Sequence, residues 1–581
     1  MSPRLPVYLS AVAIAIFILL FASTAHKPYH LDNVDFPAVA EATANTGLPL
    51  YYRGEEHPRM SGLYHPPLYI YTLAAWMRVF GPGEAQTRLF GMVCALLLGW
   101  VVLEIVRTLF GREVMRRWTP VFWVLYLLNP YTLQTATIAD IDSTIYGPLL
   151  CGVLLAVLRI SWRDGVWRTD PVRLREYGLV VLLLTLCLWA KLTTVLLTFP
   201  VVFLLLIARS GVRRALIASS AAGALGIGVF ALTYWLYGAL TSMPVSETLA
   251  FTWMSFTQRG SSSTPGLLAR LADYRRNAAF MLPFMASWTG LLPWLAGAVA
   301  LAVAAGRAWK ARDPRMQHYA ATLGLGLLAT AYYSMKVMTF GYAPFKYTLV
   351  YWPLVLTAPL FLLSGRDWST SLKVTATLSC AAFAAGAVFG TRFLQDRLMH
   401  DQFVGPYKLA AYLPALLFAA GWALRGRGGL ALAALSLALY CGMQFGSGVY
   451  QEQIAYATTY DYGQTGLVET AAFISANTGP DDVIASMKDV GFLTKRRYYE
   501  NYQAIYLDGS SRVELVKAIE SGRVSYVVFT EGRGQDQLRM NPVLRDWIRD
   551  NCTLVRSFGD YRVYMFNETL RKRRTLEGAL W

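Results

Sequence analysis

Long apolar runs follow one another from the N-terminus to about residue 447, and short polar segments separate them. Each run has roughly 17 to 25 residues, the length that a helix needs to cross about 30 Å of hydrocarbon. The pattern therefore predicts a polytopic α-helical membrane protein with about 13 transmembrane helices. The predicted spans are 7–24, 86–109, 118–135, 144–161, 176–191, 193–209, 215–239, 282–305, 319–336, 346–364, 372–390, 408–424 and 430–447.

The pattern changes after the last apolar run. GLVETAAFISANTG, SRVELVKAIESG and NPVLRDWIRDNC have helical spacing, whereas DDVIASM and SYVVFTE have the pattern of short buried strands. TLVRSFGDYRVYMF predicts a closing pair of strands. We therefore expect two domains, a membrane domain over 1–447 and a small α/β domain over 448–581.

The charges of the loops orient the spans. Loops 111–118, 159–177, 208–215, 306–315, 364–373 and 424–429 each carry an excess of Lys and Arg, which is typical of cytoplasmic loops. The alternate loops, about 25–85, 136–146 and 240–281, then face outward together with the C-terminal domain. The predicted location is the inner (cytoplasmic) membrane, with these parts on the periplasmic or extracellular side.

Composition supports this picture. The chain has 581 residues, of which 55% are hydrophobic and 15% charged, and its net charge is +17. Residues 448–581 contain 17 Lys+Arg and 17 Asp+Glu, so the excess lies in the membrane portion and does not indicate nucleic-acid binding. The six cysteines are scattered without a CxxC pair and predict neither a disulfide framework nor a zinc site. A cleaved signal peptide is the alternative interpretation of the first run.

Two pairs of aspartates stand in the outward loops. Asp32 and Asp35 follow the first span, and Asp140 and Asp142 lie in the second outer loop. Acidic side chains at a membrane boundary are costly and point to function. Asp35 also fits a helix cap before Pro37, and ordinary turn residues are the alternative for the second pair. Because both pairs face the same side, we expect one site assembled between the loops.

The stretch GLYHPPLYIY raises a second candidate. Pro66 and Pro67 fix an extended backbone and bar a helix at His65, so a helix is expected from about Leu68 to Phe80. His65 is suited to hold a metal or a phosphate, and packing is its alternative role. His57 and His65 are the candidate ligands for a divalent metal (Mg, Mn or Zn); no cofactor is predicted with certainty.

Several motifs, taken in order, resemble a known family. They are Asp35 with Ala40-Glu41, HPPLYIYTLAAWMRVFG (65–81), TRLFGMV (87–93), ADID, LWAKLTTVLLTFP (188–200) and FKYTLVYWP (345–353). Over nearly the full length the chain is similar to GT-C-fold glycosyltransferases that use polyprenyl-phosphate sugars, in the group of protein O-mannosyltransferases and the lipid A aminoarabinose transferase. It departs from the aminoarabinose-type box at Tyr64-His65, where a Glu-Lys pair stands in those relatives.

The resemblance implies an inverting transfer of a sugar from a polyprenyl-phosphate carrier to a glycan, lipid or protein acceptor at the outer face of the membrane. Such a reaction needs a carboxylate to accept the acceptor's proton and cations to stabilise the departing phosphate. Asp35 is then the expected base, and Asp142, or else Asp140, would orient the acceptor or a cation. The expected partners of the donor phosphate and substrate are Lys191, Lys346, Arg275, Arg276, His65, Asp32 and Tyr64.

Alternatives remain at this point. Lys191 and Lys346 are also placed to extend toward the membrane surface without any substrate. An oligosaccharyltransferase-like enzyme would share the topology, and YDYG (460–463) faintly resembles its tryptophan-rich box, although the first outer loop lacks a DxD. A lipid transporter or flippase predicts broken helices near mid-membrane, whereas ionisable residues here cluster at the outer ends of spans. A purely structural assembly protein is the remaining alternative.

Overall fold

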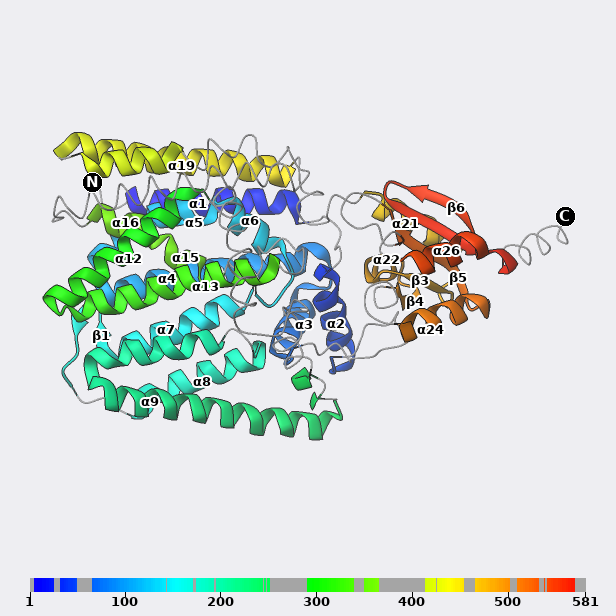
Figure 1. The fold of residues 1–581 in the computed structure, drawn as a ribbon, viewed down its shortest axis with the longest axis horizontal. Coiled ribbons are helices and arrows are strands. Elements are labelled where there is room, and N and C mark those ends of the chain that lie inside the picture. Colours follow the sequence, from blue (N-terminus) through cyan, green and yellow to red (C-terminus); the bar gives the residue numbers. More distant parts are fainter. Residues whose placement is uncertain are drawn as a thin grey trace. The chain divides into compact units, whose positions relative to one another are not determined.

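The chain forms two compact units, which are described separately (Figure 1). The first comprises Met1–Ala25, Tyr64–Tyr69 and Arg88–Gln453, and the second comprises His26–Leu63, Ile70–Thr87 and Ile454–Trp581. The structure is a computed structural model. It describes residues 5–25, 32–49, 65–142, 144–170, 174–192, 195–243, 245–246, 248–250, 290–338, 350–364, 413–424, 426–453, 465–501, 509–531, 538 and 541–569.

The first unit is helical. Among the described residues, three helices are long and apolar enough to cross a membrane, namely Glu84–Phe110, Thr198–Thr241 and Leu291–Ala311. The total of about 13 spans therefore stays a prediction. The helices of this unit are α1 (Leu5–Thr24), α4 (Glu84–Phe110), α5 (Arg112–Leu127), α6 (Pro130–Thr137), α7 (Tyr146–Ser161), α8 (Leu174–Ala190), α9 (Val195–Thr241), α12 (Leu291–Ala311), α13 (Pro314–Met338), α15 (Trp352–Val355), α16 (Thr357–Ser364) and α19 (Gly426–Gln453), with a further helix over Leu413–Ala423.

The packing of α7 against α8 and α9 positions the candidate site. A two-stranded antiparallel hairpin, β1 (Trp162–Arg163) and β2 (Val166–Trp167), follows α7 and turns the chain toward α8. Because α7 and α8 pack together with this short connection at one end, the N-terminus of α7 and the C-terminus of α8 meet at the other end. Residues on either side of these two termini are thereby brought close together.

The predicted spans and the observed helices differ in places. The span predicted over 118–135 is interrupted, because α5 ends at Leu127 and a new helix, α6, begins at Pro130, and proline is favoured at the first position of a helix. The spans predicted over 193–209 and 215–239 are both present, as the two helical parts of α9 on either side of Gly211, which leaves the helical conformation with φ 74° and ψ 164°. The predicted span 372–390 and most of the loop 240–281 lie outside the described residues.

The second unit contains a mixed five-stranded sheet. Its strands are β3 (Val483–Ser486), β4 (Arg497–Glu500), β5 (Val524–Thr530), β6 (Cys552–Phe558) and β7 (Tyr561–Phe566), in the order β4-β3-β5-β7-β6. β3 is parallel to β4 and β5, and β7 is antiparallel to β5 and β6. Two helices from the segment between α1 and α4, α2 (Asp32–Thr46) and most of α3 (Leu68–Phe80), belong to the same unit.

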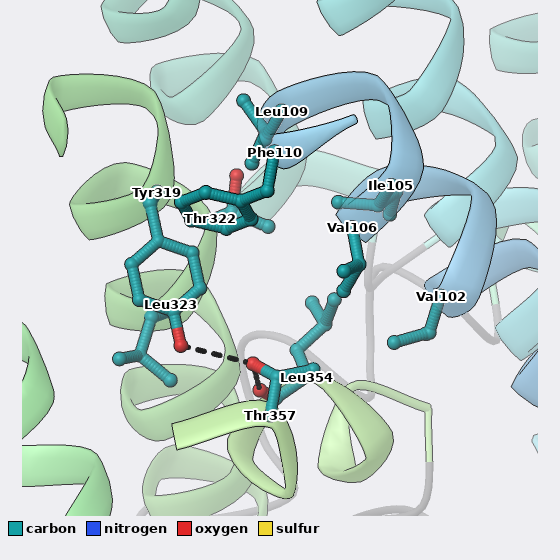
Figure 2. Close-up of a pocket in the computed structure, with 10 residues that line it drawn as sticks. All are labelled: Val102, Ile105, Val106, Leu109, Phe110, Tyr319, Thr322, Leu323, Leu354 and Thr357. Carbon is teal, nitrogen blue, oxygen red and sulfur yellow. Dashed lines mark hydrogen bonds between the residues drawn. The ribbon is translucent and has the colours of Figure 1, made fainter. Parts of the chain in front are cut away.

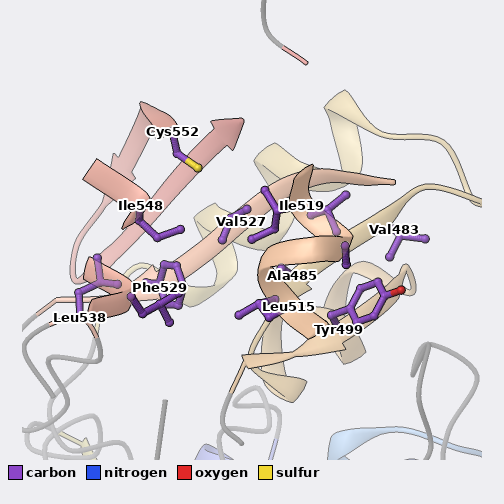
Figure 3. Packing of buried hydrophobic residues seen from close by; sticks show 13 residues of the cluster. Val483, Ala485, Tyr499, Leu515, Ile519, Val527, Phe529, Leu538, Ile548 and Cys552 are labelled. Atoms are coloured by element: carbon purple, nitrogen blue, oxygen red, sulfur yellow. The ribbon is translucent and has the colours of Figure 1, made fainter. Parts of the chain in front are cut away.

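Helices cover both faces of this sheet. Alternate residues of a strand point to opposite faces, so Val483 and Ala485 pack with Ile519 of α24 (Gly509–Glu520) in the cluster that Figure 3 shows, which also includes α26 (Pro542–Asn551). Ile484 packs on the other face with Val490, among residues of α21 (Leu467–Asn477) and α22 (Lys488–Thr494). The helices and strands predicted over 466–566 are present, and β4 and α22 are additional elements.

Candidate active site

The second outer loop of the sequence is a compact turn between α6 and α7. The Asp140 Oδ1 accepts a hydrogen bond from the backbone N–H of Asp142 at 3.1 Å, and the Thr144 hydroxyl donates to the carbonyl of Asp140 at 2.6 Å. Both aspartates are buried, with 5% and 3% of their surface exposed. The turn is therefore braced by its own side chains, and it holds two carboxylates away from bulk solvent.

Lys191 meets this turn from the end of α8. Its Nζ forms an ion pair with the Oδ2 of Asp142, and both side chains are buried. The phenol of Tyr146, the first residue of α7, donates a hydrogen bond to the carbonyl of Lys191 at 2.9 Å. The structure thus brings together two predicted site residues that lie 49 positions apart. It contradicts the alternative in which Lys191 merely extends toward the membrane surface, because 7% of its side chain is exposed.

The pair consists of an ammonium group and a carboxylate that face each other in a buried, low-dielectric environment. Removing two charges from water costs several kcal/mol per ion, and their attraction repays this only with good geometry. An ammonium group is a point-charge partner for phosphate, and a carboxylate orients a hydroxyl or a cation. The pair thus places one group of each of these two kinds side by side in a buried position.

Arg88 is a residue of this region that sequence reasoning missed as a site candidate. It lies in the TRLF motif on α4 and is 1% exposed. Its Nη1 donates to the carbonyl of Ala25, directly after α1, at 2.9 Å, and its Nε donates to the carbonyl of Thr137, the last residue of α6, at 3.2 Å. A guanidinium group suits helix C-termini because these carry partial negative charge. Arg88 therefore ties the C-terminal end of α1 to that of α6.

The first outer loop is partly described. α2 begins at Asp32, so Asp35 lies within the helix and the cap interpretation is wrong; the side chains of both residues are outside the description. His65 is half-buried, and α3 follows over Leu68–Phe80, which confirms the helix predicted after the two prolines.

Five other predicted site residues lie outside the residues that the structure describes. They are Tyr64, His57, Lys346, Arg275 and Arg276. Among the residues that the structure does describe, no group of three or more His, Cys, Asp or Glu side chains lies close enough together to hold a metal ion.

A small cavity between α4, α13 and the α15–α16 segment is distinct from this turn (Figure 2). Its volume is about 10 Å³, roughly the space of one water molecule. The Tyr319 and Thr357 hydroxyls hydrogen-bond each other at 3.1 Å, and the Thr357 hydroxyl lies 2.7 Å from the carbonyl of Leu354. The cavity is too small for a sugar, and these hydroxyls already have partners within the protein.

Comparisons with known proteins agree with the predicted resemblance. Residues 64–237 match the family described as dolichyl-phosphate-mannose-protein mannosyltransferase. No curated protein sequence matches the chain.

The fold is also found in solved structures. ArnT from Cupriavidus metallidurans bound to undecaprenyl phosphate is 14% identical, with a TM-score of 0.55 over 97% of this chain and 98% of that one. ArnT from the same organism in the apo state gives 14% identity and a TM-score of 0.54 over 95% and 97%. The apo oligosaccharyltransferase of Archaeoglobus fulgidus is 11% identical, with a TM-score of 0.51 over 91% of this chain and 70% of that one. The chain thus has the GT-C fold of ArnT and this oligosaccharyltransferase, and within it residues 64–237 match the dolichyl-phosphate-mannose-protein mannosyltransferase family.

Proposed function

We propose that the chain is a membrane glycosyltransferase that moves a sugar from a polyprenyl-phosphate carrier to an acceptor. The family match over 64–237 and the likeness in fold to a protein solved with undecaprenyl phosphate support this function. The observation that carries it is the buried pair of Lys191 and Asp142, because phosphate recognition and acceptor orientation need a cation and a carboxylate. A polar pair of this kind in a helical membrane domain marks a functional site.

The proposed reaction is a direct displacement with inversion. The acceptor oxygen attacks the anomeric carbon, the bond from that carbon to the phosphate oxygen breaks, and polyprenyl phosphate leaves with the electron pair. Asp35 takes the acceptor's proton as general base. Lys191 binds the donor phosphate, and Asp142, once its ammonium partner turns to the phosphate, orients the acceptor. Asp140 holds the backbone of Asp142 in place through the 3.1 Å hydrogen bond.

The remaining predicted residues have proposed roles in the same reaction. His65 is a proposed donor contact because it directly precedes α3, and Lys346, Arg275, Arg276, Tyr64 and Asp32 are further candidates. The proposed location is the cytoplasmic membrane, with 1–447 as the membrane domain and 448–581 as an extracytoplasmic domain. A glycan, a lipid or a protein is the proposed acceptor.

The test measures release of polyprenyl phosphate by the purified protein from a panel of polyprenyl-phospho-sugars, with crude acceptor extract, with and without a chelator. We expect one donor to be turned over by the wild type and by the control Asp546→Asn, an exposed aspartate on α26. Asp35→Asn should abolish turnover without loss of folded protein. Retained turnover in Asp35→Asn would refute the assignment of the base. Loss of turnover in the presence of the chelator would indicate that the reaction requires a metal ion.

Oligosaccharide transfer is the second candidate, because the fold likeness extends to the archaeal oligosaccharyltransferase. The same assay with a lipid-linked oligosaccharide and a peptide acceptor distinguishes it. Transfer of the oligosaccharide, with single-sugar carriers left intact, would replace the first proposal. Silence of the folded wild type toward all donors would favour a flippase.

A further inference from the structure

The second unit packs a helix of the first outer loop against the C-terminal domain. α2 contacts α22, the helix that follows strand β3 (Figure 1). The Nζ of Lys495, the residue that ends α22, lies 3.6 Å from the Oε2 of Glu41 on α2. α2 is also the helix that carries Asp35, six residues before Glu41. The C-terminal domain thus touches the element that bears the proposed base.

Lys495 occupies an unusual backbone position. Its φ is 54° and its ψ is 29°, the left-handed conformation in which a helix usually ends with glycine. A side chain with a Cβ is disfavoured there, and residues held in such conformations cluster at functional sites. The Lys495 Nζ lies 4.0 Å from the centre of the Phe492 ring as well as near Glu41. A glycine at position 495 would adopt this backbone conformation without strain. We therefore attribute the presence of a lysine there to its side-chain contacts with Phe492 and Glu41.

α2 is held by further contacts within the same unit. At its C-terminal end, the Arg78 Nε donates to the carbonyl of Ala44 at 2.8 Å, and the Tyr71 hydroxyl donates to the carbonyl of Gly47 at 3.3 Å. Ala38 and Ala40 are buried, and such small side chains let neighbouring elements approach closely. The pair with Lys495 adds a support from the C-terminal domain to those supplied by α3.

We propose that Lys495 and Glu41 are positioning residues of the transfer reaction, and that α22 sets the position of α2 and so of Asp35. This inference rests on the proposed function. Neither residue is placed in contact with substrate; they act through α2. A small displacement of a base slows a reaction strongly, because proton transfer needs a close and directed contact.

The test uses the full-length protein with four variants. Lys495→Gly removes the side chain and relaxes the backbone, and Glu41→Gln removes the charge of its partner. Exchange of the two, Glu41→Lys with Lys495→Glu, restores an ion pair of opposite polarity. Lys517→Ala on α24 is the matched control, since it removes a lysine from the same domain. For each variant we would measure kcat and donor KM, and amide hydrogen exchange over residues 32–46.

We expect Lys495→Gly and Glu41→Gln to lower kcat by on the order of tenfold with little change in donor KM. Exchange in 32–46 should become faster, because α2 loses a support. The exchanged pair should recover both properties, the control should match the wild type, and Lys495→Gly should unfold no earlier than the wild type.

Two results would overturn the positioning role. One is an unchanged kcat in Lys495→Gly and Glu41→Gln, whatever the exchange rates. The other is a loss of kcat that the exchanged pair does not recover. A wild type without transfer activity would instead refute the proposed function, and faster exchange in Lys495→Gly would still support the docking of α2 on α22.

Discussion

Two buried cationic side chains organise the first unit at the residue scale. Lys191 balances the charge of Asp142, and Arg88 binds the carbonyls of Ala25 and Thr137. Each of these cations is more than nine-tenths buried, so each must find compensation inside the protein. The two residues differ in what they bind, since Lys191 faces a carboxylate and Arg88 faces the ends of two helices.

Removing one partner of the Lys191–Asp142 pair should lower the stability of the protein, and removing the second partner as well should restore most of it. Lys191→Met leaves the Asp142 carboxylate without its cation, and we expect a loss of about 3 to 5 kcal/mol in the free energy of unfolding. The double variant Lys191→Met with Asp142→Asn removes both charges and should regain most of that stability. It should not regain donor turnover if the charges serve the reaction. Thermal unfolding in detergent and the donor assay measure the two effects, and a double variant with full activity would contradict the assigned roles.

Replacing Arg88 tests a geometric role. Arg88→Lys keeps the charge but loses the planar fork that reaches two carbonyls, so at least one buried carbonyl loses its partner. We expect a destabilisation of about 1 to 3 kcal/mol. The control Arg117→Lys changes an exposed residue that pairs with Glu113 one helical turn away, and it should shift stability by less than about 0.5 kcal/mol. Equal unfolding temperatures of the two variants would show that the Arg88 hydrogen bonds matter little.

The sequence predicted some of this site and missed the rest for physical reasons. Asp142 and Lys191 stood out because charges at the ends of apolar runs are costly. Their pairing could not be predicted, since it depends on how α7 and α8 pack and on a turn that hides both side chains. Arg88 has the same sequence context as a lysine or arginine that reaches the membrane surface. Its contacts with Ala25 and Thr137 distinguish it.

At the scale of single helices, some prolines and glycines mark a helix boundary or a kink, whereas others lie inside a continuous helix. Pro130 begins α6, whereas Pro120 lies inside α5 and Pro200 inside α9. The local sequence predicts a possible break at each proline, and the surrounding packing decides which one occurs. This explains why the long apolar helices were predicted well while the division of 118–135 into two helices was missed. The turn expected at 208–215 is present, and Gly211 is its non-helical residue.

Gly211 is the residue that allows the change of direction within α9. Its φ of 74° with ψ of 164° is disfavoured for residues with a Cβ, although no atom lies within 4 Å of the place that a Cβ would occupy. Gly211→Ala should therefore destabilise the protein by about 1 to 3 kcal/mol through the backbone alone. Gly228→Ala, at a helical glycine of α9 with equal free space, should be neutral or stabilising by up to about 1 kcal/mol. Equal unfolding temperatures in detergent would contradict the role of Gly211.

At the scale of the whole molecule, each of the two units is formed by segments that are distant in the sequence. The second unit joins His26–Leu63 and Ile70–Thr87 to the C-terminal residues, so α2 and most of α3 belong with the α/β sheet. Hydrophobic patterning identified the strands and helices of the C-terminal domain other than β4 and α22, because strands and helices each have their own period. Patterning carries no information on which distant helix packs on which, and the association of α2 with α22 was therefore not predictable from the sequence.

This association makes a prediction about truncation. Removal of residues 455–581 takes away α22 and leaves α2 without that partner, so we expect donor turnover to fall by at least about a hundredfold, not merely a change of acceptor. A shorter truncation that removes 570–581, beyond the last strand β7, is the control and should retain wild-type turnover. Both proteins would be compared at equal folded amounts, with hydrolysis of the donor measured beside transfer. A long truncation that still cleaves the donor at the wild-type rate would show that the C-terminal domain acts as a separate module, and that α2 keeps its position without α22.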